Sequence, residues 1–170
     1  YGQQVAAVAL AEVGVREVGR NGGAEVARYI ADAGGDPDAF PPWCAYFARW
    51  CHLVAAEQLD LETTCPPMPG AAKGWVRAGR GDLVRFLPNG ARVYPDLATG
   101  DRGEYQPEPG DIVIWARKRD RGGVATIRKD RLRKGHAGIV TGHAGGLTFR
   151  TVEGNTNALG SATGDGVYEK

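Results

Sequence analysis

The hydrophobic pattern changes once along this chain, and that change limits its possible folds more than any other feature. Apolar residues recur at helical spacing in three early segments, at residues 3–13, 25–33 and 43–58. Later segments are rich in β-branched and aromatic residues, as is typical of strands, at residues 82–87, 111–115, 136–141 and 147–153. Helices first and strands afterwards predict an α+β fold, with N-terminal helices packed on a C-terminal antiparallel β-sheet.

Length and composition fit one globular domain. With 170 residues, the chain can bury a core without a disulfide scaffold. Its apolar content of 42% argues against a disordered chain, and no apolar run approaches the ~20 residues that span a membrane. We therefore expect residues 1–170 to form a single, monomeric domain without a membrane span.

Cys44 lies in the first turn of the helix expected at residues 43–58. Backbone N–H groups in a first helical turn lack intrahelical acceptors, and the helix dipole there favours negative charge. Both effects favour a thiolate, a strong nucleophile for acyl transfer, and the same N–H groups can stabilise an oxyanion. Position alone favours the simpler interpretation, a small buried residue.

The other two cysteines have structural interpretations. Cys51 follows Cys44 by about 10.5 Å along the same helix, too far for a disulfide, and is expected in the core. Cys65 lies in a Pro-rich segment, where it either pairs with Cys51 in an exported protein or stays a free thiol. Because the sequence contains no close C-x-x-C pair, we expect no metal site.

Three histidines compete for the role of general base. His52 lies about 12 Å beyond Cys44 along the same helix, outside hydrogen-bond reach. His143 falls in an expected turn, where a polar residue is unremarkable. His136 opens a strand next to a loop, which is where a rigid scaffold presents side chains to a cleft.

A hairpin is expected to give His136 a polar partner. A turn centred on Ala144 and Gly145 would set His136 directly opposite Glu153, with Cβ atoms about 5 Å apart. Asn155 lies two residues beyond Glu153 and is expected on the same face. A surface pair without function is the alternative, and the coincidence of cysteine, histidine and carboxylate at element ends makes it less favoured.

Four short motifs follow one another along the chain: Pro42-Trp-Cys-Ala-Tyr-Phe47, Pro109-Gly-Asp-Ile-Val113, Gly135-His-Ala-Gly-Ile-Val140 and Val152-Glu-Gly-Asn-Thr-Asn157. Together they resemble the cysteine, histidine-dependent amidohydrolase/peptidase (CHAP) family of papain-like cell-wall enzymes. One such motif would be a weak signal, whereas four in the family's order make a specific one. The resemblance covers the chain from about Val13 onwards and implies a papain-like version of the α+β fold.

The resemblance also implies roles for individual residues. Cys44 would be the nucleophile, His136 the general base, Glu153 the orienting carboxylate and Asn155 its polar companion. The substrate would be an amide bond of peptidoglycan, cut by an amidase or an endopeptidase without a cofactor. Such an enzyme acts at the bacterial cell wall, so a secreted, periplasmic or phage-associated protein is expected.

Candidate substrate contacts come from two places. Residues 14–23 are similar to the stretch before the cysteine in many family members, so Glu17 and Asn21 are expected to line the cleft. Trp43 and Trp115 are expected in the core or in the cleft wall, where they would contact substrate. The Asp-rich calcium loop of some phage members is absent from this sequence.

A basic segment separates the second and third motifs. Residues 117–135 hold nine Lys or Arg and two Asp, a net charge of +7. The range Arg117–Lys134 would attract anionic wall polymers, or it is simply a solvated loop, the commoner role of a charge run. Nucleic-acid binding is disfavoured because no aromatic residues are interleaved to stack on bases.

Two other functions fit the same residues. A cysteine amidase or protease acting on a non-wall peptide would use the same chemistry. A wall-binding module that has lost activity is disfavoured because Cys44, His136 and Glu153 are all present. The motifs do not distinguish a phage lysin from an autolysin or an interbacterial toxin, since specificity lies in loop geometry.

Overall fold

The computed structural model describes residues 1–62, 107–117, 134–145, 148–158 and 164–170. Its helical elements are α1 (Gly2–Ala11), α2 (Ala24–Asp32), the 3-10 turn η1 (Pro37–Ala39) and α3 (Cys44–Gln58). Its strands are β1 (Ile112–Arg117), β2 (Lys134–Gly145), β3 (Thr148–Thr156) and β4 (Gly166–Glu169). The strand expected at residues 82–87, Cys65 and most of the basic segment lie outside the described residues.

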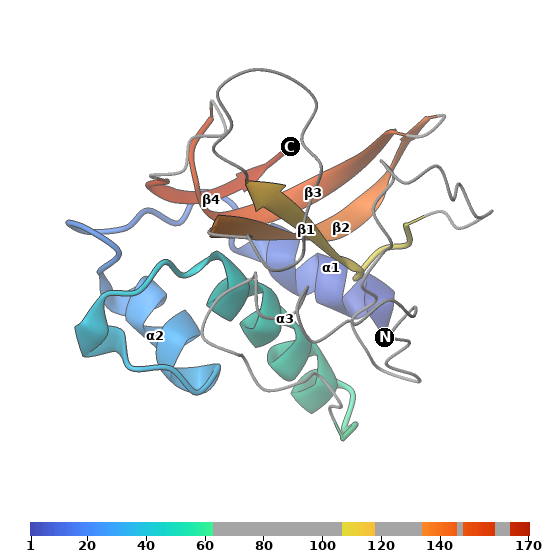
Figure 1. Cartoon of the computed structure of the whole chain (residues 1–170). Coiled ribbons are helices and arrows are strands. Elements are labelled where there is room, and N and C mark those ends of the chain that lie inside the picture. The colour runs from blue at the N-terminus through green and yellow to red at the C-terminus, as the bar shows by residue number, and fades with distance from the viewer. Residues whose placement is uncertain (63–106, 118–133, 146–147, 159–163) are drawn as a thin grey trace, which may run out of the picture.

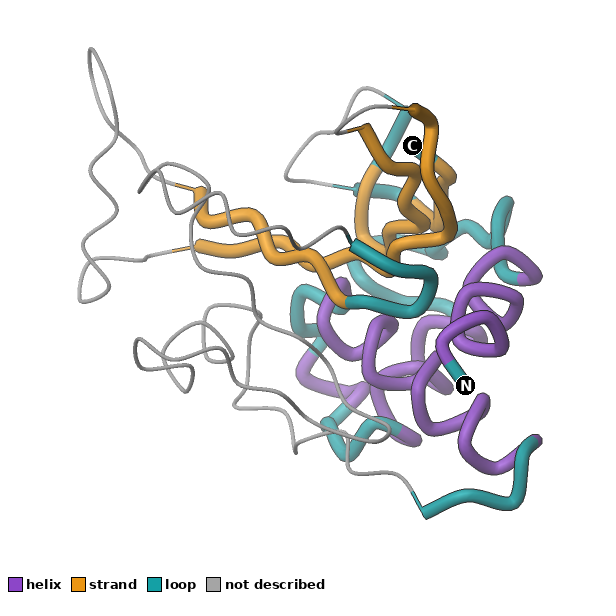
Figure 2. The backbone as a smooth tube through the Cα atoms, turned by 90° about the vertical axis from the view of Figure 1, so that its right-hand side faces the viewer, coloured by secondary structure: helices purple, strands orange, loops and turns teal. Residues whose placement is uncertain are grey.

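The helices and strands form two layers. The strands make one antiparallel sheet in the order β1-β2-β3-β4. Helices α1 and α3 pack against this sheet, and α2 packs on α3 (Figure 1). Seen from the side, the helices and the strands separate clearly (Figure 2). This is the α+β arrangement that the order of the segments predicted, in the papain-like form that the resemblance implied.

The core lies between the two layers. Ala137 and Ile139 of β2 and Val152 of β3 are fully buried and belong to this core. From the helical side, α3 and its cap residue Trp43 contribute a nearly continuous set of buried residues that includes Phe47 and Cys51. Helix α3 is therefore enclosed by the sheet and the other helices, and its start is fixed relative to β2 and β3.

The sheet opens between β2 and β3 at one end. The last pair that joins these strands is Ile139 with Val152. Beyond it, β2 still pairs with β1 as far as Lys134, while β3 pairs with β4 as far as Thr156. This opening lies where α3 begins, because Gly154 of β3 contacts the start of that helix.

Gly154 sets how closely β3 approaches α3. A Cβ atom at this position would lie 2.6 Å from Cζ3 of Trp43 and 2.8 Å from Cβ of Phe47. Both neighbours are fully buried and have no free space to move into. A glycine is therefore required where the strand backbone meets the helix.

Replacing Gly154 by alanine is expected to lower the free energy of unfolding by about 1–3 kcal/mol, the usual cost of overpacking a close contact. Urea denaturation measures this directly. Gly142→Ala is the matched control, because a Cβ atom there meets only the mobile end of the Arg150 side chain, at 3.3 Å. Equal effects from the two substitutions would contradict the close approach of β3 to α3.

The hairpin register differs from the expected one. Val140 pairs with Thr151, whereas the expected turn would have paired it with Phe149. Pairing starts at Gly145 with Thr148, and two irregularities of the ladder follow before Val140 is reached. The direct pairing of His136 with Glu153 was therefore wrong, because His136 lies beyond the last β2–β3 pair.

Element boundaries were otherwise close to those predicted. Helix α1 ends at Ala11, two residues before the predicted end at Val13, and α3 begins at Cys44 with Trp43 as its cap residue. Strand β4 was not predicted, since four residues are too few to show a pattern. No helix in the described part of the chain is long and apolar enough to cross a lipid bilayer.

Candidate active site

Cys44 is the first residue of α3. No side chain caps this helix end in the described structure, and the first intrahelical bond runs from Phe47 N to Trp43 O at 2.8 Å. The N–H groups of Cys44, Ala45 and Tyr46 therefore precede the helical hydrogen-bond ladder. They supply positive electrostatic potential where the thiol group lies. The Cys44 residue is buried, with 6% of its surface exposed.

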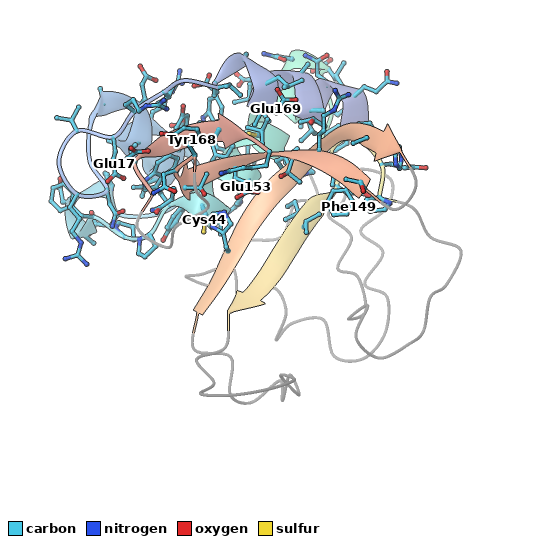
Figure 3. The ribbon with its side chains drawn as sticks, turned by 90° about the horizontal axis from the view of Figure 1, so that it is seen from above. Glu17, Cys44, Phe149, Glu153, Tyr168 and Glu169 are labelled. Carbon is cyan, nitrogen blue, oxygen red and sulfur yellow. The ribbon has the colours of Figure 1, made fainter. Side chains whose placement is uncertain are left out.

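His136 and Glu153 face each other across the opening between β2 and β3. Nε2 of His136 lies 2.8 Å from Oε2 of Glu153, and both residues are buried. His136 also interacts with the Cys44 side chain, an interaction that raises the pKa of the imidazole. Because Glu153 occupies Nε2, Nδ1 is the ring nitrogen left for the thiol. Figure 3 shows Cys44 and Glu153 at the same end of the sheet, with Phe149 at the other end of β3.

The electrostatics favour a charged imidazole. Burial by itself lowers the pKa of His136, but hydrogen bonds and charge attraction from Cys44 and Glu153 outweigh it and raise the pKa to about 9. Burial also raises the pKa of Glu153, and the hydrogen bond and charge of His136 more than reverse this, so that its pKa is lowered. His136 thus interacts with both the thiol side chain and the carboxylate, as expected of a base between a nucleophile and an orienting group.

Comparison with known protein families agrees with this geometry. The CHAP domain family matches residues 35–155, a range that contains Cys44, His136 and Glu153. The chain belongs to the CHAP family. CHAP proteins are cysteine- and histidine-dependent amidohydrolases or peptidases, so this chain is assigned to a family of hydrolases. No curated protein and no solved structure matched the chain.

Asn155, the last residue of the CHAP match, holds the start of α3. One terminal atom of its amide lies 3.0 Å from Asn21 Oδ1, 2.9 Å from the backbone nitrogen of Trp43 and 3.2 Å from Trp43 Nε1. As nitrogen this atom donates to Asn21, and as oxygen it accepts from Trp43. The amide therefore connects the end of β3 to the residues that lead into Cys44.

The regular strand conformation does not continue from Glu153 to Asn155. Its φ angle of 55° is left-handed, a conformation that asparagine tolerates better than most residues. The β3–β4 register shifts between Glu153 and Thr156, so the alternation of faces is interrupted. The regular two-residue spacing, on which the shared face of Glu153 and Asn155 was predicted, is therefore interrupted between them.

The four residues expected to bind substrate are Glu17, Asn21, Trp43 and Trp115. Trp43 Nε1 donates to Glu17 Oε2 at 3.1 Å, and Asn21 donates to the carbonyl of Phe40 at 2.9 Å. Trp43 is 0% exposed, so of its two expected places it occupies the core and not the cleft wall, and no surface is left to bind substrate. Trp115 pairs with His136 across β1 and β2, but its side chain lies outside the described residues.

The remaining cysteine and histidines lie in other surroundings. Cys51 is a free, fully buried thiol, and burial raises its pKa well above the ordinary value. His52 is also buried, and burial lowers its pKa to about 4; its Nδ1 lies 3.0 Å from the Tyr1 hydroxyl. His143 is exposed at the far end of β2. Within the described ranges, no group of three or more His, Cys, Asp or Glu is arranged to hold a metal ion.

One contact of this site was not foreseen from the sequence. The hydroxyl of Thr151 donates to Oε1 of Glu153 at 3.0 Å, and Thr151 is buried. The sequence contained a partial signal, because residues two apart in a strand lie on the same face. Threonine is so common in strands that this signal alone does not identify a partner.

Proposed function

We propose that this protein is a peptidoglycan hydrolase that cleaves an amide bond, with Cys44 as nucleophile, His136 as acid and base, and Glu153 as orienting carboxylate. The observation that carries the proposal is the position of His136, which forms a hydrogen bond with Glu153 and also interacts with Cys44. CHAP family membership supports amide hydrolysis as the reaction class. Peptidoglycan as the substrate follows from the resemblance to cell-wall enzymes of this family.

In the first half of the reaction, the Cys44 thiolate attacks the carbonyl carbon of the amide. Negative charge then develops on the carbonyl oxygen, and the free N–H groups at the start of α3 are suitable donors for it. When the intermediate collapses, the C–N bond breaks and His136 gives its proton to the leaving nitrogen. The products are a free amine and a thioester on Cys44.

In the second half, water hydrolyses the thioester. Neutral His136 takes a proton from the water, and the resulting hydroxide attacks the thioester carbonyl. The C–S bond breaks, a carboxylic acid leaves, and the Cys44 thiolate forms again beside the protonated imidazole. Glu153 holds the ring through Nε2 in both halves, which keeps Nδ1 available and stabilises the imidazolium.

A wall substrate implies action outside the cytoplasm, so we propose a secreted, periplasmic or phage-associated enzyme. The basic segment 117–135 would favour approach to anionic wall polymers through its net charge of +7. The alternative substrate is a peptide unrelated to the wall, which the same three side chains would cleave equally well.

Digestion of purified sacculi followed by mass spectrometry tests the proposal. We expect soluble fragments that carry new amino and carboxyl ends from one type of amide bond, and no release by Cys44→Ala. A new end at the lactyl–alanine junction would identify an amidase, and one within the stem or bridge peptide an endopeptidase. Intact sacculi together with cleavage of a generic peptide amide would replace the wall substrate with the alternative one.

A further inference from the structure

The carboxylate of Glu153 has a different partner on each oxygen. Oε2 lies 2.8 Å from Nε2 of His136, and Oε1 accepts the hydroxyl proton of Thr151 at 3.0 Å. All three residues are buried, and Thr151 is only 3% exposed. In such surroundings a carboxylate oxygen without a donor is costly, so the Thr151 hydroxyl stabilises the charged carboxylate in one orientation.

The backbone of Thr151 is fixed more firmly than that of Glu153. Thr151 pairs with Val140 of β2 on one side and exchanges two backbone hydrogen bonds with Lys170 on the other, at 2.9 and 2.8 Å. Its side chain is branched at Cβ and has few rotamers. Glu153 lies just past the last β2–β3 pair, where the sheet has opened and pairing with β2 no longer holds it.

We propose that Thr151 is a positioning residue for this site: its hydroxyl holds the Glu153 carboxylate across the opening between β2 and β3, so that Glu153 orients His136 toward Cys44. The inference rests on the proposed role of these three side chains in hydrolysis. Thr151 itself acts only through Glu153. The order of contacts is Thr151, Glu153, His136 and Cys44. Hydrogen bonds join Thr151 to Glu153 and Glu153 to His136, and His136 in turn interacts with Cys44.

The charge on Glu153 depends on groups from β2 and β3 and on Lys170, which follows β4. His136 of β2 bonds it, Tyr168 of β4 is its cross-strand partner, and Lys170 lies close enough for its charge to act on the carboxylate. Burial raises the pKa of Glu153, whereas His136, Thr151 and Lys170 lower it. Loss of the Thr151 hydroxyl removes a donor that favours the charged form, so Glu153 would be protonated at a higher pH.

Thr151→Val and Thr151→Ser separate the hydroxyl from the shape of the side chain. Valine keeps the branched shape but cannot donate, and serine keeps the donor. We expect Thr151→Val to lower kcat about tenfold with little change in KM, and to move the acid limb of the pH–rate profile to higher pH. Thr151→Ser should restore the wild-type acid limb and most of kcat.

Thr156→Val is the matched control. Thr156 is a fully buried threonine on the same strand, and its hydroxyl has no partner in the described part of the structure. The same substitution there changes packing without removing a donor to Glu153. An acid limb that moves equally in Thr156→Val and Thr151→Val would overturn the proposal, as would an unmoved limb in Thr151→Val.

A readout that needs no turnover separates this inference from the proposed substrate. Carbon-13 NMR titration of the Glu153 carboxyl group, assigned with Glu153→Gln, should show protonation at higher pH in folded Thr151→Val than in wild type or Thr156→Val. If that shift is seen but no wall fragments are released, Thr151 still positions Glu153 and the wall substrate is wrong. If all three proteins titrate alike, Thr151 is not a positioning residue.

Discussion

Cys44→Ala is expected to reduce hydrolysis by roughly 10⁴-fold or more, because no other group at the start of α3 can form the acyl intermediate. Cys44→Ser should be nearly as inactive, since a serine hydroxyl is a far weaker nucleophile than a thiolate beside His136. Both variants should stay folded, because each replaces a small side chain by one of similar size. Release of sacculus fragments and the far-UV circular dichroism spectrum measure the two quantities.

Cys51→Ala provides the control on the same helix. Cys51 is fully buried, and its raised pKa leaves it as an unreactive thiol. Its removal should cost some stability and leave most of the activity, and we expect the same retention for Cys65→Ala. Iodoacetamide should inactivate the wild-type enzyme with the label on Cys44. Inactivation with the label on Cys51 or Cys65 alone would rule out Cys44 as the nucleophile.

His136→Ala is expected to lower kcat by roughly 10³-fold or more, because both the base for water and the acid for the leaving amine are lost. In the wild type, activity should rise with pH as Glu153 loses its proton and the Cys44 and His136 pair reaches its ionised form. It should then fall as pH rises through about 9, since the pKa of His136 is raised to that value and the imidazolium proton is lost. Rates measured from pH 4 to 10 test both limbs.

His143→Ala is the matched control for this substitution. His143 is exposed on the same strand, and it pairs with Phe149 far from the opening of the sheet. The variant should keep the wild-type rate and pH profile. Similar losses from His136→Ala and His143→Ala would mean that a general effect on β2, and not loss of the base, explains the inactivation.

The sequence located the groups that depend on local structure. Cys44 was expected at a helix start because the apolar spacing of α3 and the prolines before it are local signals, and the structure places it there. His136 was expected on a strand beside a loop for similar reasons. The Gly135-His motif and the Glu153 motif then gave the family, because short motifs in a fixed order persist where specificity loops vary.

The tertiary structure decided how these elements meet. The alternation of β-residues indicates faces, but the pairing of strands depends on turn position and bulges that periodicity does not report. The expected register set His136 opposite Glu153, whereas the observed ladder stops at Ile139 and Val152. The hydrogen bond between His136 and Glu153 is nevertheless present, because it crosses the opening of the sheet.

The chain by itself therefore determined the order of helices and strands, the α+β class and the identity of the three interacting side chains. Only the tertiary structure decided that Asn155 joins the start of α3, that Trp43 is enclosed, and that Thr151 holds Glu153. The reason is physical: helix and strand preferences arise from neighbours within a few residues. The contact of Gly154 with α3 joins segments roughly 100 residues apart. The opening between β2 and β3 arises because β2 continues its pairing with β1 while β3 continues its pairing with β4, which no local pattern encodes.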